Sequence, residues 1–600
     1  MQNTTLYSLF MPPEDCYGDF GLMCGFTATR QVLGQIRRTF TGEMARPVLA
    51  AFIHPTVNAI SDVPGLAWMW MRLVGRGYNL LHAKAALLGF RKRGGDGYVI
   101  RLAVSTGNWT QDPLTRSIDL FWSIDLDSAV PDAQDIADIR AAHEMFGWLR
   151  ERADCALIER SFDGHRPDAL LEAAITALPT SSARPRFMDS RNQALFPQVV
   201  ERLGTKKKAD RLILGSGYFE SDGDGAAGLP ERLRRALVQE KSLTKTAALD
   251  LFLNPSSCQG LAARAGALID AGWNLRPPRS VLHGTDGCLH AKFVVLASGE
   301  TEASGRAYLG SGNLSMNGFE RAASAGGNLE AGVIVDLPGG LKWPRRRDTR
   351  NGIAAVLPIQ FTDVVTPEAL QQGEGFVRPD EPETQPPVAW LIWQDGVLSA
   401  PEDKSVMVIG VDAAQAQTPC AWPAPAPAIV TLAEDGWRLP VISSEALVVA
   451  RPSDMSVEDI LASLGSFPEP GDADSEDEGE EGEEPLTDAS DTTEAPPAAY
   501  PIRRMMELLV RLCETQARLD PRDWQRWCRE LQQNLCAIAS REKTMLEFFR
   551  NARANPLPAL ADPRMRPEGV SPDLLRDALL AVSVAWELSA YPSLWEREAA

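Results

Sequence analysis

The sequence lacks the features that mark several common protein classes. Its nine cysteines include no Cys-x-x-Cys pair, so neither a zinc ribbon nor a dense disulfide framework is indicated, and we expect reduced, buried thiols. No run of about 18 or more apolar residues occurs, and the first twenty residues show no basic segment followed by an apolar stretch. We therefore expect a cytoplasmic protein with no membrane partner, no structural metal and no cofactor.

Acidic residues outnumber basic ones, but this imbalance is local. The 600 residues carry a net charge of −20, and residues 469–494 alone contain 13 Asp and Glu with no Lys or Arg. The rest of the chain is only mildly acidic and can hold a basic groove, because affinity for phosphate backbones depends on where Lys and Arg lie. The charge therefore does not exclude DNA or RNA as a substrate.

One tetrapeptide occurs twice. Leu-His-Ala-Lys stands at residues 81–84 and again at 289–292. A second shared element follows each copy, as Ser105-Thr106-Gly107-Asn108 and as Gly310-Ser311-Gly312-Asn313. Repetition of two linked elements predicts a duplicated structural unit within the first 343 residues.

Strands and helices are predicted to alternate around both copies. Apolar runs at 80–90 and 98–108, and again at 288–297 and 306–313, indicate strand, turn and strand, with both motifs near strand ends. Further strands are expected at 47–53 and 211–218, and helices at 141–153 and 230–240. This alternation predicts an α/β fold.

The second half of the chain has a different composition. Between residues 344 and 466, short apolar runs separated by Pro- and Gly-rich turns predict a small β-rich domain. Residues 467–499 offer too little apolar material to offset the entropy of ordering them, so we expect a disordered acidic linker, either a tether or a mimic of nucleic acid in a basic groove. Residues 500–600 are predicted to form a C-terminal helical domain, since Asp520 and Ser571 each precede a Pro that can begin a helix.

The repeated residues can hydrolyse a phosphodiester without a metal ion. Such an enzyme must neutralise the non-bridging oxygens, supply a nucleophile and protonate the leaving oxygen. On a strand, the His and Lys of each copy would share one face, because side chains alternate with period two. One imidazole must be neutral to attack phosphorus while the other is protonated to donate. The predicted catalytic residues are His82, His290, Lys84, Lys292, Asn108 and Asn313.

The paired motifs resemble those of the phospholipase D superfamily. Its larger branch has Asp at the fifth position after the Lys, where this sequence has Gly89 and Ala297. The His, Lys, Asn version is instead similar to the tyrosyl-DNA phosphodiesterase branch. The resemblance implies a two-lobed αβα sandwich with a pseudo-twofold repeat, in which residues 1–180 form the first lobe and 181–343 the second.

The same resemblance implies roles for individual residues. His82 would be the nucleophile that forms a phosphohistidine and His290 the general acid, although the two roles can be exchanged. Asp119 and Glu330 would orient the histidines from behind. Ser105 and Ser311 would lie in the same supporting layer as these carboxylates.

Other candidates also have a structural interpretation. His54 and His283 can approach the site, but surface or core roles are favoured for them, as for His143 and His165. The runs 91–93 and 206–208, rich in Lys and Arg, can line a nucleic-acid groove or form solvated turns. Trp524 and Trp527, at helical spacing, favour a hydrophobic core over a platform for base stacking.

The leading hypothesis is a metal-independent phosphodiesterase that acts on nucleic acid, DNA rather than RNA, as a nuclease or in the processing of DNA ends. By analogy with multidomain members of the superfamily, we also expect a role in defence against foreign DNA, together with a helicase or ATPase partner. The alternatives are a phospholipid hydrolase or phosphatidyltransferase, and a nucleic-acid-binding assembly subunit that works with a helicase. No basic amphipathic anchor favours the lipid enzyme, and the intact motifs argue against a subunit without catalysis.

Overall fold

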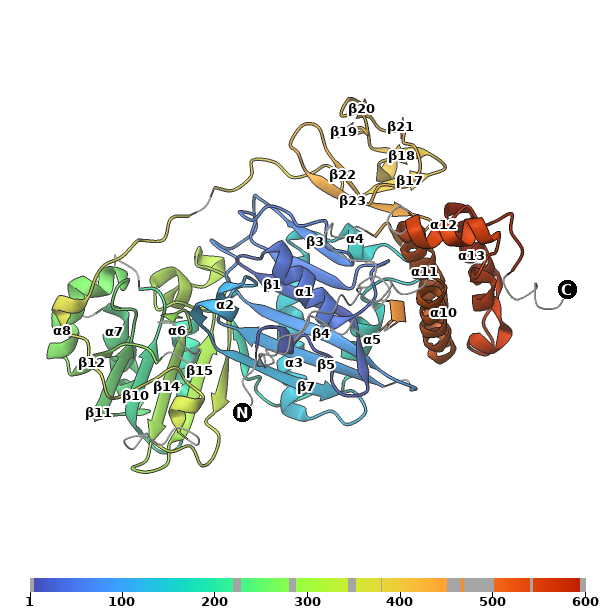
Figure 1. Cartoon of the computed structure of the whole chain (residues 1–600). Helices are drawn as coiled ribbons and strands as arrows, with labels where there is room; N and C mark the ends of the chain where they lie inside the picture. Colours follow the sequence, from blue (N-terminus) through green and yellow to red (C-terminus); the bar gives the residue numbers. More distant parts are fainter. Residues whose placement is uncertain are drawn as a thin grey trace, which may run out of the picture.

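The computed structural model describes most of the chain. The described residues are 5–95, 97–219, 228–279, 287–343, 352–378, 380–449, 464–465, 467–468, 501–539 and 543–593. His283 and all but Phe467 and Pro468 of the predicted acidic linker lie outside them. Two large mixed sheets stand side by side within the first 343 residues (Figure 1). We call the parts of the chain around these sheets lobe 1 and lobe 2.

The sheet of lobe 1 contains seven strands within the described residues, in the order β7-β5-β4-β1-β2-β3-β8. These strands are β1 (Cys16–Gly25), β2 (Leu49–Ile53), β3 (Leu66–Met71), β4 (Ala85–Lys92), β5 (Tyr98–Ser105), β7 (Phe121–Asp127) and β8 (Ala153–Asp154). Every residue of β2 is buried, as expected for a parallel strand covered on both faces. The accompanying helices are α1 (Arg30–Phe40), α2 (Asp112–Thr115), α3 (Ala133–Arg150), α4 (Ala156–Glu159) and α5 (Ala169–Ala177), with α1 on one face of the sheet and α3 and α5 on the other (Figure 1).

The sheet of lobe 2 also has seven strands among the described residues, in the order β12-β11-β10-β14-β15-β16-β9. Its strands are β9 (Phe187–Asp189), β10 (Ala209–Gly215), β11 (Leu243–Phe252), β12 (Trp273–Arg276), β14 (Phe293–Ser298), β15 (Ser304–Gly310) and β16 (Ala331–Asp336). Its helices are α6 (Leu195–Leu203), α7 (Gly228–Gln239) and α8 (Ala265–Asp270). The core against α6 and α7 is separate from the core on the opposite face, which Leu341, Trp343 and Ile353 help to cover.

The two sheets repeat one pattern of pairing. In lobe 1, β3, β2 and β1 are parallel, and β4, β5 and β7 continue from β1 as antiparallel neighbours. In lobe 2, β12, β11 and β10 are parallel, and β14, β15 and β16 continue from β10 in the same way. The mixed α/β class predicted from the sequence is confirmed, while the pseudo-twofold axis and the sandwich description stay predictions.

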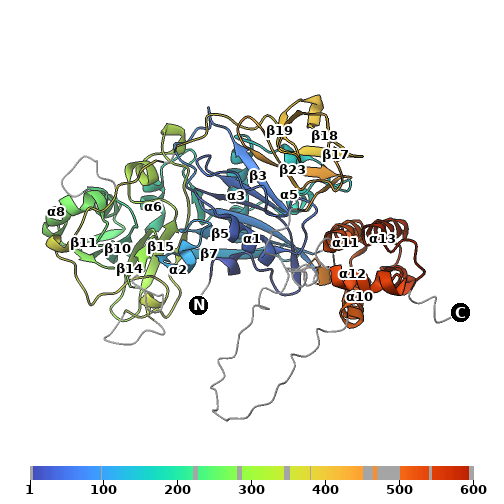
Figure 2. The same cartoon turned by 45° about the horizontal axis from the view of Figure 1, so that its top comes forward.

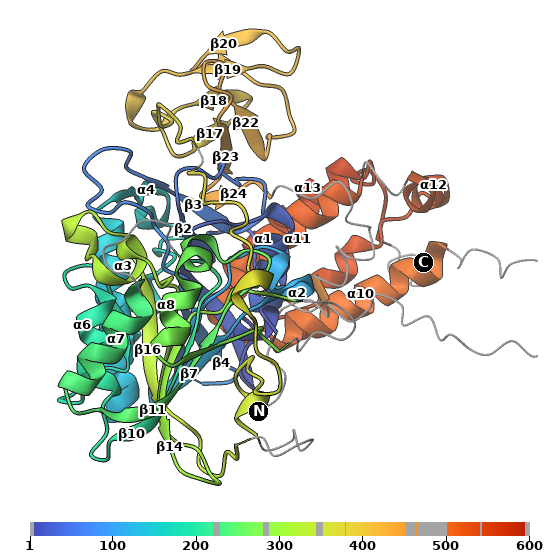
Figure 3. The same ribbon diagram turned by 90° about the vertical axis from the view of Figure 1, so that its left-hand side faces the viewer.

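Smaller strands follow in the predicted β-rich region. They are β17 (Leu391–Gln394), β18 (Val397–Ser399), β19 (Met407–Ile409), β20 (Gln415–Gln417), β21 (Cys420–Ala421), β22 (Ile429–Thr431), β23 (Arg438–Ser443) and β24 (Ala446–Leu447). They stand above lobe 1 in Figure 3 and contact it where Trp437 packs edge-on to Trp70 and Leu447 N donates to Ala45 O at 2.8 Å. The domain boundary at residue 344 stays a prediction, and residues 352–372 pack along lobe 2 without forming a named strand.

The C-terminal helices lie beside lobe 1, on the side away from lobe 2 (Figure 2). They are α10 (Pro501–Arg518), α11 (Trp524–Ile538), α12 (Lys543–Ala552) and α13 (Asp573–Ala585). Trp524 and Trp527 are buried in their core, as predicted, and the Asp520 side chain caps the turn that leads into α11. None of the described helices is both long and apolar enough to cross a membrane.

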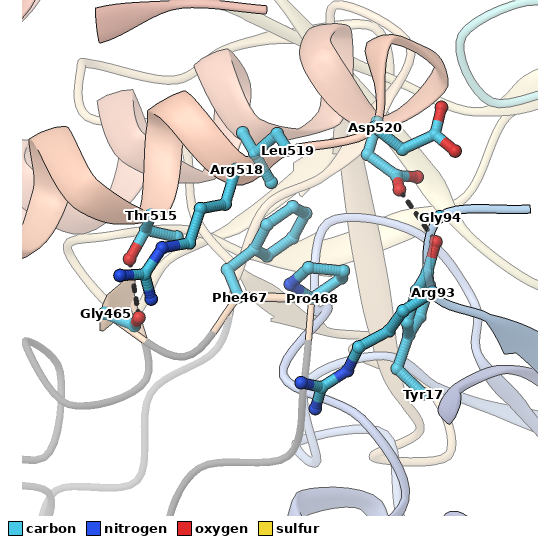
Figure 4. Close-up of a pocket in the computed structure, with 11 residues that line it drawn as sticks. Tyr17, Arg93, Gly94, Gly465, Phe467, Pro468, Thr515, Arg518, Leu519 and Asp520 are labelled. Atoms are coloured by element: carbon cyan, nitrogen blue, oxygen red, sulfur yellow. Dashed lines mark hydrogen bonds between the residues drawn. The ribbon is translucent and has the colours of Figure 1, made fainter. Parts of the chain in front are cut away.

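Ion pairs attach these helices to lobe 1. Asp523 accepts two hydrogen bonds of 2.8 Å from Arg91, and Arg529 pairs with Asp163 at 2.8 Å. A cavity of about 310 Å³ remains in this interface, where Arg93 of lobe 1 and Arg518 of α10 lie on its rim (Figure 4). The run 91–93 therefore contributes Arg91 to an internal interface and not to an open groove.

Candidate active site

The two repeated tetrapeptides do not lie on strands as predicted, but immediately before them. Strand β4 begins after Lys84, and β14 begins after Lys292. The reason is that each motif pairs with the other lobe: His82 N and Ala83 N both donate to Leu329 O, at 2.9 and 2.7 Å. His290 N and Ala291 N likewise donate to Ile118 O, at 3.0 and 2.8 Å, beside the short pairing of β13 (Cys288–Leu289) with β6 (Ser117–Ile118). The backbone hydrogen bonds thus fix both motifs at the junction of the lobes.

His82 is held by a carboxylate from lobe 2. Its Nδ1 lies 2.8 Å from Oε2 of Glu330, which is fully buried just before β16. Ser311 Oγ donates to the same carboxylate oxygen at 2.5 Å, and Asn328 Nδ2 donates to Oε1 at 3.2 Å. Because Nδ1 is the donor to Glu330, Nε2 of a neutral His82 keeps its lone pair.

His290 has the reciprocal arrangement with lobe 1. Its Nδ1 lies 2.9 Å from Oδ1 of the buried Asp119, which stands between β6 and β7. Thr106 Oγ1 donates to that oxygen at 2.8 Å, and Ser117 Oγ donates to Oδ2 at 2.6 Å. Each imidazole is therefore oriented by a carboxylate of the opposite lobe, so the site needs both lobes in place.

The two lysines lie beneath the histidines. Lys84 and Lys292 are buried, and neither makes an ion pair with a carboxylate in the described part of the chain. Lys84 Nζ donates to His82 O at 2.8 Å, and Lys292 Nζ approaches Thr106 O at 3.4 Å. Burial lowers the pKa of Lys84 to about 7 and that of Lys292 to about 8, with Lys292 further lowering that of Lys84. Buried positive charge without a paired anion suits a site that receives an anion.

The two asparagines complete the site. Asn108 and Asn313 line the same cavity as His82 and His290. The Oδ1 atoms of both asparagines are buried and make no hydrogen bond within the described structure. Buried polar groups in folded proteins are normally satisfied, so this symmetrical pair of free amide oxygens marks positions for ligand contacts.

The cavity has a volume of about 400 Å³. Amide side chains of Asn79, Asn317 and Asn328 form part of its lining, and Phe26 and Phe376 form an aromatic part. None of the described lining residues is Lys or Arg, and the exposed lysines 206–208 are not among them. The described walls of the cavity therefore carry no Lys or Arg, and Lys84 and Lys292 are buried next to His82 and Thr106 without lining it.

Burial lowers the pKa of both imidazoles. It lowers the pKa of His82 to about 4, although Glu330 opposes this shift. Burial and Lys292 lower the pKa of His290 below its ordinary value, and Asp119 opposes them. The His82 side chain is 11% exposed and that of His290 33%. His82 is thus the less exposed of the two imidazoles.

The supporting carboxylates stay ionised. Burial alone would raise the pKa of Glu330 and of Asp119, but each lies beside an imidazole and an ammonium group that favour the charged form. The pKa of both carboxyl groups consequently lies below its ordinary value. An ionised carboxylate accepts from Nδ1 and stabilises the imidazolium when its histidine takes up a proton.

Sequence reasoning misplaced one supporting residue. Ser105 Oγ bonds to the backbone of Gly107 and makes no contact with Asp119, whereas Thr106 does. Aligning the two repeats on Asn108 and Asn313 pairs Thr106 with Ser311, so the signal was present in the sequence. Ser117 and Asn79 were also missed, because only the folded chain brings them to the carboxylate and to Asn328.

Among the other histidines, His54 lies nearest to the site. Its buried ring packs against Phe26 with 5.2 Å between centroids, and Phe26 in turn packs against His82 at 5.7 Å. His143 pairs with Glu172, and His165 bonds to the backbone of its own turn. His54 is therefore part of the wall behind Phe26 and does not line the cavity.

Comparison with known proteins gives structural matches only. No protein-family model matches the sequence, and no curated protein matches it significantly. Yeast tyrosyl-DNA phosphodiesterase matches with 12% identity and a TM-score of 0.38, over 55% of this chain and 86% of that chain. A point variant of the same yeast enzyme matches with 14% identity and a TM-score of 0.38, over 55% and 85%.

Polyphosphate kinase from Porphyromonas gingivalis matches with 11% identity and a TM-score of 0.29, over 55% of this chain and 42% of that chain. All three matches have TM-scores below 0.5, and each covers 55% of this chain.

Proposed function

We propose that this chain is a metal-independent phosphodiesterase that cleaves nucleic acid, DNA in preference to RNA, through a phosphohistidine on His82. The observation that supports this most directly is the pair of histidines at one cavity, each oriented by an ionised carboxylate and underlain by a buried lysine. This set supplies a nucleophile, a proton donor and charge neutralisation together. Aromatic and amide walls suit the ring and the polar edges of a nucleotide unit.

The first step uses the two imidazoles in different protonation states. Nε2 of neutral His82 attacks phosphorus, the bond from phosphorus to the leaving oxygen breaks, and His290 gives its proton to that oxygen. Lys84, Lys292 and the amide NH₂ groups of Asn108 and Asn313 hold the non-bridging oxygens, where charge develops. Glu330 stabilises the positive charge on His82 once its Nε2 has bonded to phosphorus.

The second step restores the site. His290, now neutral, takes a proton from a water molecule, which attacks phosphorus as the bond to Nε2 of His82 breaks. The phosphate product leaves, and His290 is protonated again for the next turnover. The lower exposure of the His82 side chain, 11% against 33% for His290, supports its assignment as the nucleophile over the exchanged assignment, because burial disfavours the charged imidazolium. A helicase or ATPase partner and a setting in defence against foreign DNA stay predictions from the sequence.

We expect turnover to persist in EDTA, because the described residues contain no group of three or more His, Cys, Asp or Glu that could hold a metal ion and because the lysines already neutralise the phosphate. The measurement is a panel of single- and double-stranded DNA, RNA, phosphotyrosyl-DNA and phosphatidylcholine, each with and without EDTA. If only phosphatidylcholine is cleaved, the protein is a phospholipid hydrolase and does not act on nucleic acid. Loss of all cleavage in EDTA, with recovery in magnesium or manganese, would contradict the mechanism.

The pH dependence should follow the lowered imidazole pKa values. The value of kcat/KM should rise as the pH increases through about 4, because His82 loses its proton there. It should fall as the pH increases further through the pKa of His290, which lies below 6.5, because His290 then loses its own proton. Bound phosphodiester is an anion and raises the pKa of His290, so kcat should decline at a higher pH than kcat/KM does. Initial rates between about pH 4 and 9 test this, and a kcat/KM maximum above about pH 8 would refute it.

A further inference from the structure

The segment that leads from lobe 2 to the small strands passes beside the active-site cavity, which its residue Phe376 lines. We call residues 371–381 the connecting strap, of which residue 379 is outside the described residues. Figure 1 shows it within the yellow trace that runs from beside α8 toward β17. Residues 371–378 and 380 are exposed, Glu381 is half-buried, and the described strap has no regular secondary structure. Its position nevertheless depends on contacts at both ends.

Hydrogen bonds hold the strap to both lobes. At the lobe 2 end, Cys258 N donates to Gln371 O at 3.0 Å and Gln259 N donates to Gln372 O at 2.8 Å. At the lobe 1 end, Arg378 Nη1 donates to Asn79 Oδ1 at 2.8 Å. The strap therefore spans the junction at which the two histidines meet.

Glu381 fastens the lobe 1 end of the strap. Its carboxylate accepts from Arg76 at 2.6 and 2.8 Å and from Arg378 at 2.5 Å, and it faces His54 Nε2 at 4.0 Å. The bidentate geometry of Arg76 with this carboxylate fixes position as well as contributing energy. Arg378 is consequently held in one place over lobe 1.

Phe376 lies between the two hydrogen-bonded ends of the strap and lines the active-site cavity. Its side chain is 49% exposed, yet it lines the cavity that contains His82 and His290. Its ring centroid lies 6.1 Å from that of Phe26, which is itself 5.7 Å from His82. A half-exposed phenyl ring beside a catalytic imidazole offers an apolar surface that a ligand ring can cover.

We propose that Phe376 is a specificity-determining residue that stacks on an aromatic ring attached to the scissile phosphate, and that Glu381 positions it by fastening the strap. This inference rests on the proposed phosphodiesterase function. The ring can be a nucleobase on one side of the phosphate or an aryl leaving group on the other. Both are flat rings, and stacking on an aromatic side chain does not depend on which one is bound.

The test compares two chromogenic substrates with the same leaving group: the p-nitrophenyl phosphodiester of thymidine and methyl p-nitrophenyl phosphate. We expect Phe376→Ala to lower kcat/KM for the thymidine ester by roughly tenfold or more, and Phe376→Trp to restore it. Glu381→Gln should act in the same direction by loosening the strap. Val377→Ala is the matched control, since Val377 is the neighbouring residue, is 84% exposed and does not line the cavity.

The outcomes separate this inference from the function on which it rests. A loss confined to the thymidine ester identifies the stacked ring as the nucleobase, and an equal loss on both substrates identifies it as the leaving aryl group. Unchanged kcat/KM for both substrates in Phe376→Ala, with active wild-type protein, overturns the inference. A wild-type protein that cleaves neither substrate instead contradicts the proposed function. Thermal unfolding of each variant shows whether it is folded.

Discussion

Replacing His82 with Ala should abolish turnover of every phosphodiester substrate, with a fall in kcat of roughly 10⁴- to 10⁶-fold. No other described side chain that lines the cavity can act as a nitrogen nucleophile at neutral pH. His290 is engaged as the proton donor, and the buried Lys84 and Lys292 do not line the cavity. Steady-state kinetics with the thymidine ester measure this loss. His143→Ala is the control, since that histidine lies on α3 and pairs with Glu172 away from the cavity.

His290→Ala should behave differently from His82→Ala. A leaving group such as p-nitrophenolate departs without needing a proton, so attack by His82 should survive in this variant. Hydrolysis of the phosphohistidine should not, because no base remains to activate water. We expect a burst of p-nitrophenolate followed by very slow turnover, and equal loss of burst and turnover in the two variants would show that the histidines do not divide the work in this way.

Replacing Lys84 with Met should weaken catalysis and stabilise the fold at the same time. The value of kcat/KM should fall by roughly 10²- to 10³-fold, as for removal of one donor to a developing oxyanion. The pKa of Lys84 in the folded protein, about 7, lies below the ordinary lysine value of 10.5, so the charged lysine opposes folding. The free energy of unfolding of the wild-type protein should therefore decrease as the pH falls from 10.5 to about 7, because Lys84 takes up its proton more readily in the unfolded chain. The Lys84→Met variant should lack this pH dependence.

Urea unfolding at pH 7 and at pH 9 measures the change in the free energy of unfolding, alongside the kinetics. Lys208→Met is the matched control, because Lys208 is exposed and does not line the cavity. Unaltered kcat/KM in Lys84→Met would remove this lysine from the phosphate site. A variant that is less stable than the wild type at pH 7 would show that the buried ammonium is already compensated in the free protein.

The sequence predicted the regular elements of the lobes closely where the apolar pattern was strong. Strand β2 falls within the expected 47–53, and α7 begins two residues before and ends one residue before the expected 230–240. Helix α3 begins at Ala133 and not at residue 141, because the Asp132 side chain caps it by accepting from Gln134 N and Asp135 N. That cap was visible in the sequence, as were Ile136 and Ile139, which are buried in the first turns of the helix.

The chemistry of the site was predictable and its assembly was not. Two copies of a motif identify the histidines, lysines and asparagines without knowledge of the fold. The exchange of carboxylates between the lobes, Glu330 to His82 and Asp119 to His290, depends on how the two sheets meet. Phe376 gave no signal at all, because it lies in a turn-rich stretch without periodicity and gains its place only from the hydrogen bonds at both ends of the strap.

The central claim is that a covalent phosphohistidine forms on His82, and the most direct measurement is mass spectrometry of the protein after a single turnover. His290→Ala is incubated with the p-nitrophenyl phosphodiester of thymidine and quenched in alkali, because phosphohistidine is labile in acid. The account predicts an increase equal to one thymidine phosphate on the peptide that contains His82, and none in His82→Ala. An adduct on the peptide that contains His290 in the His82→Ala protein, and no adduct in His290→Ala, would contradict it.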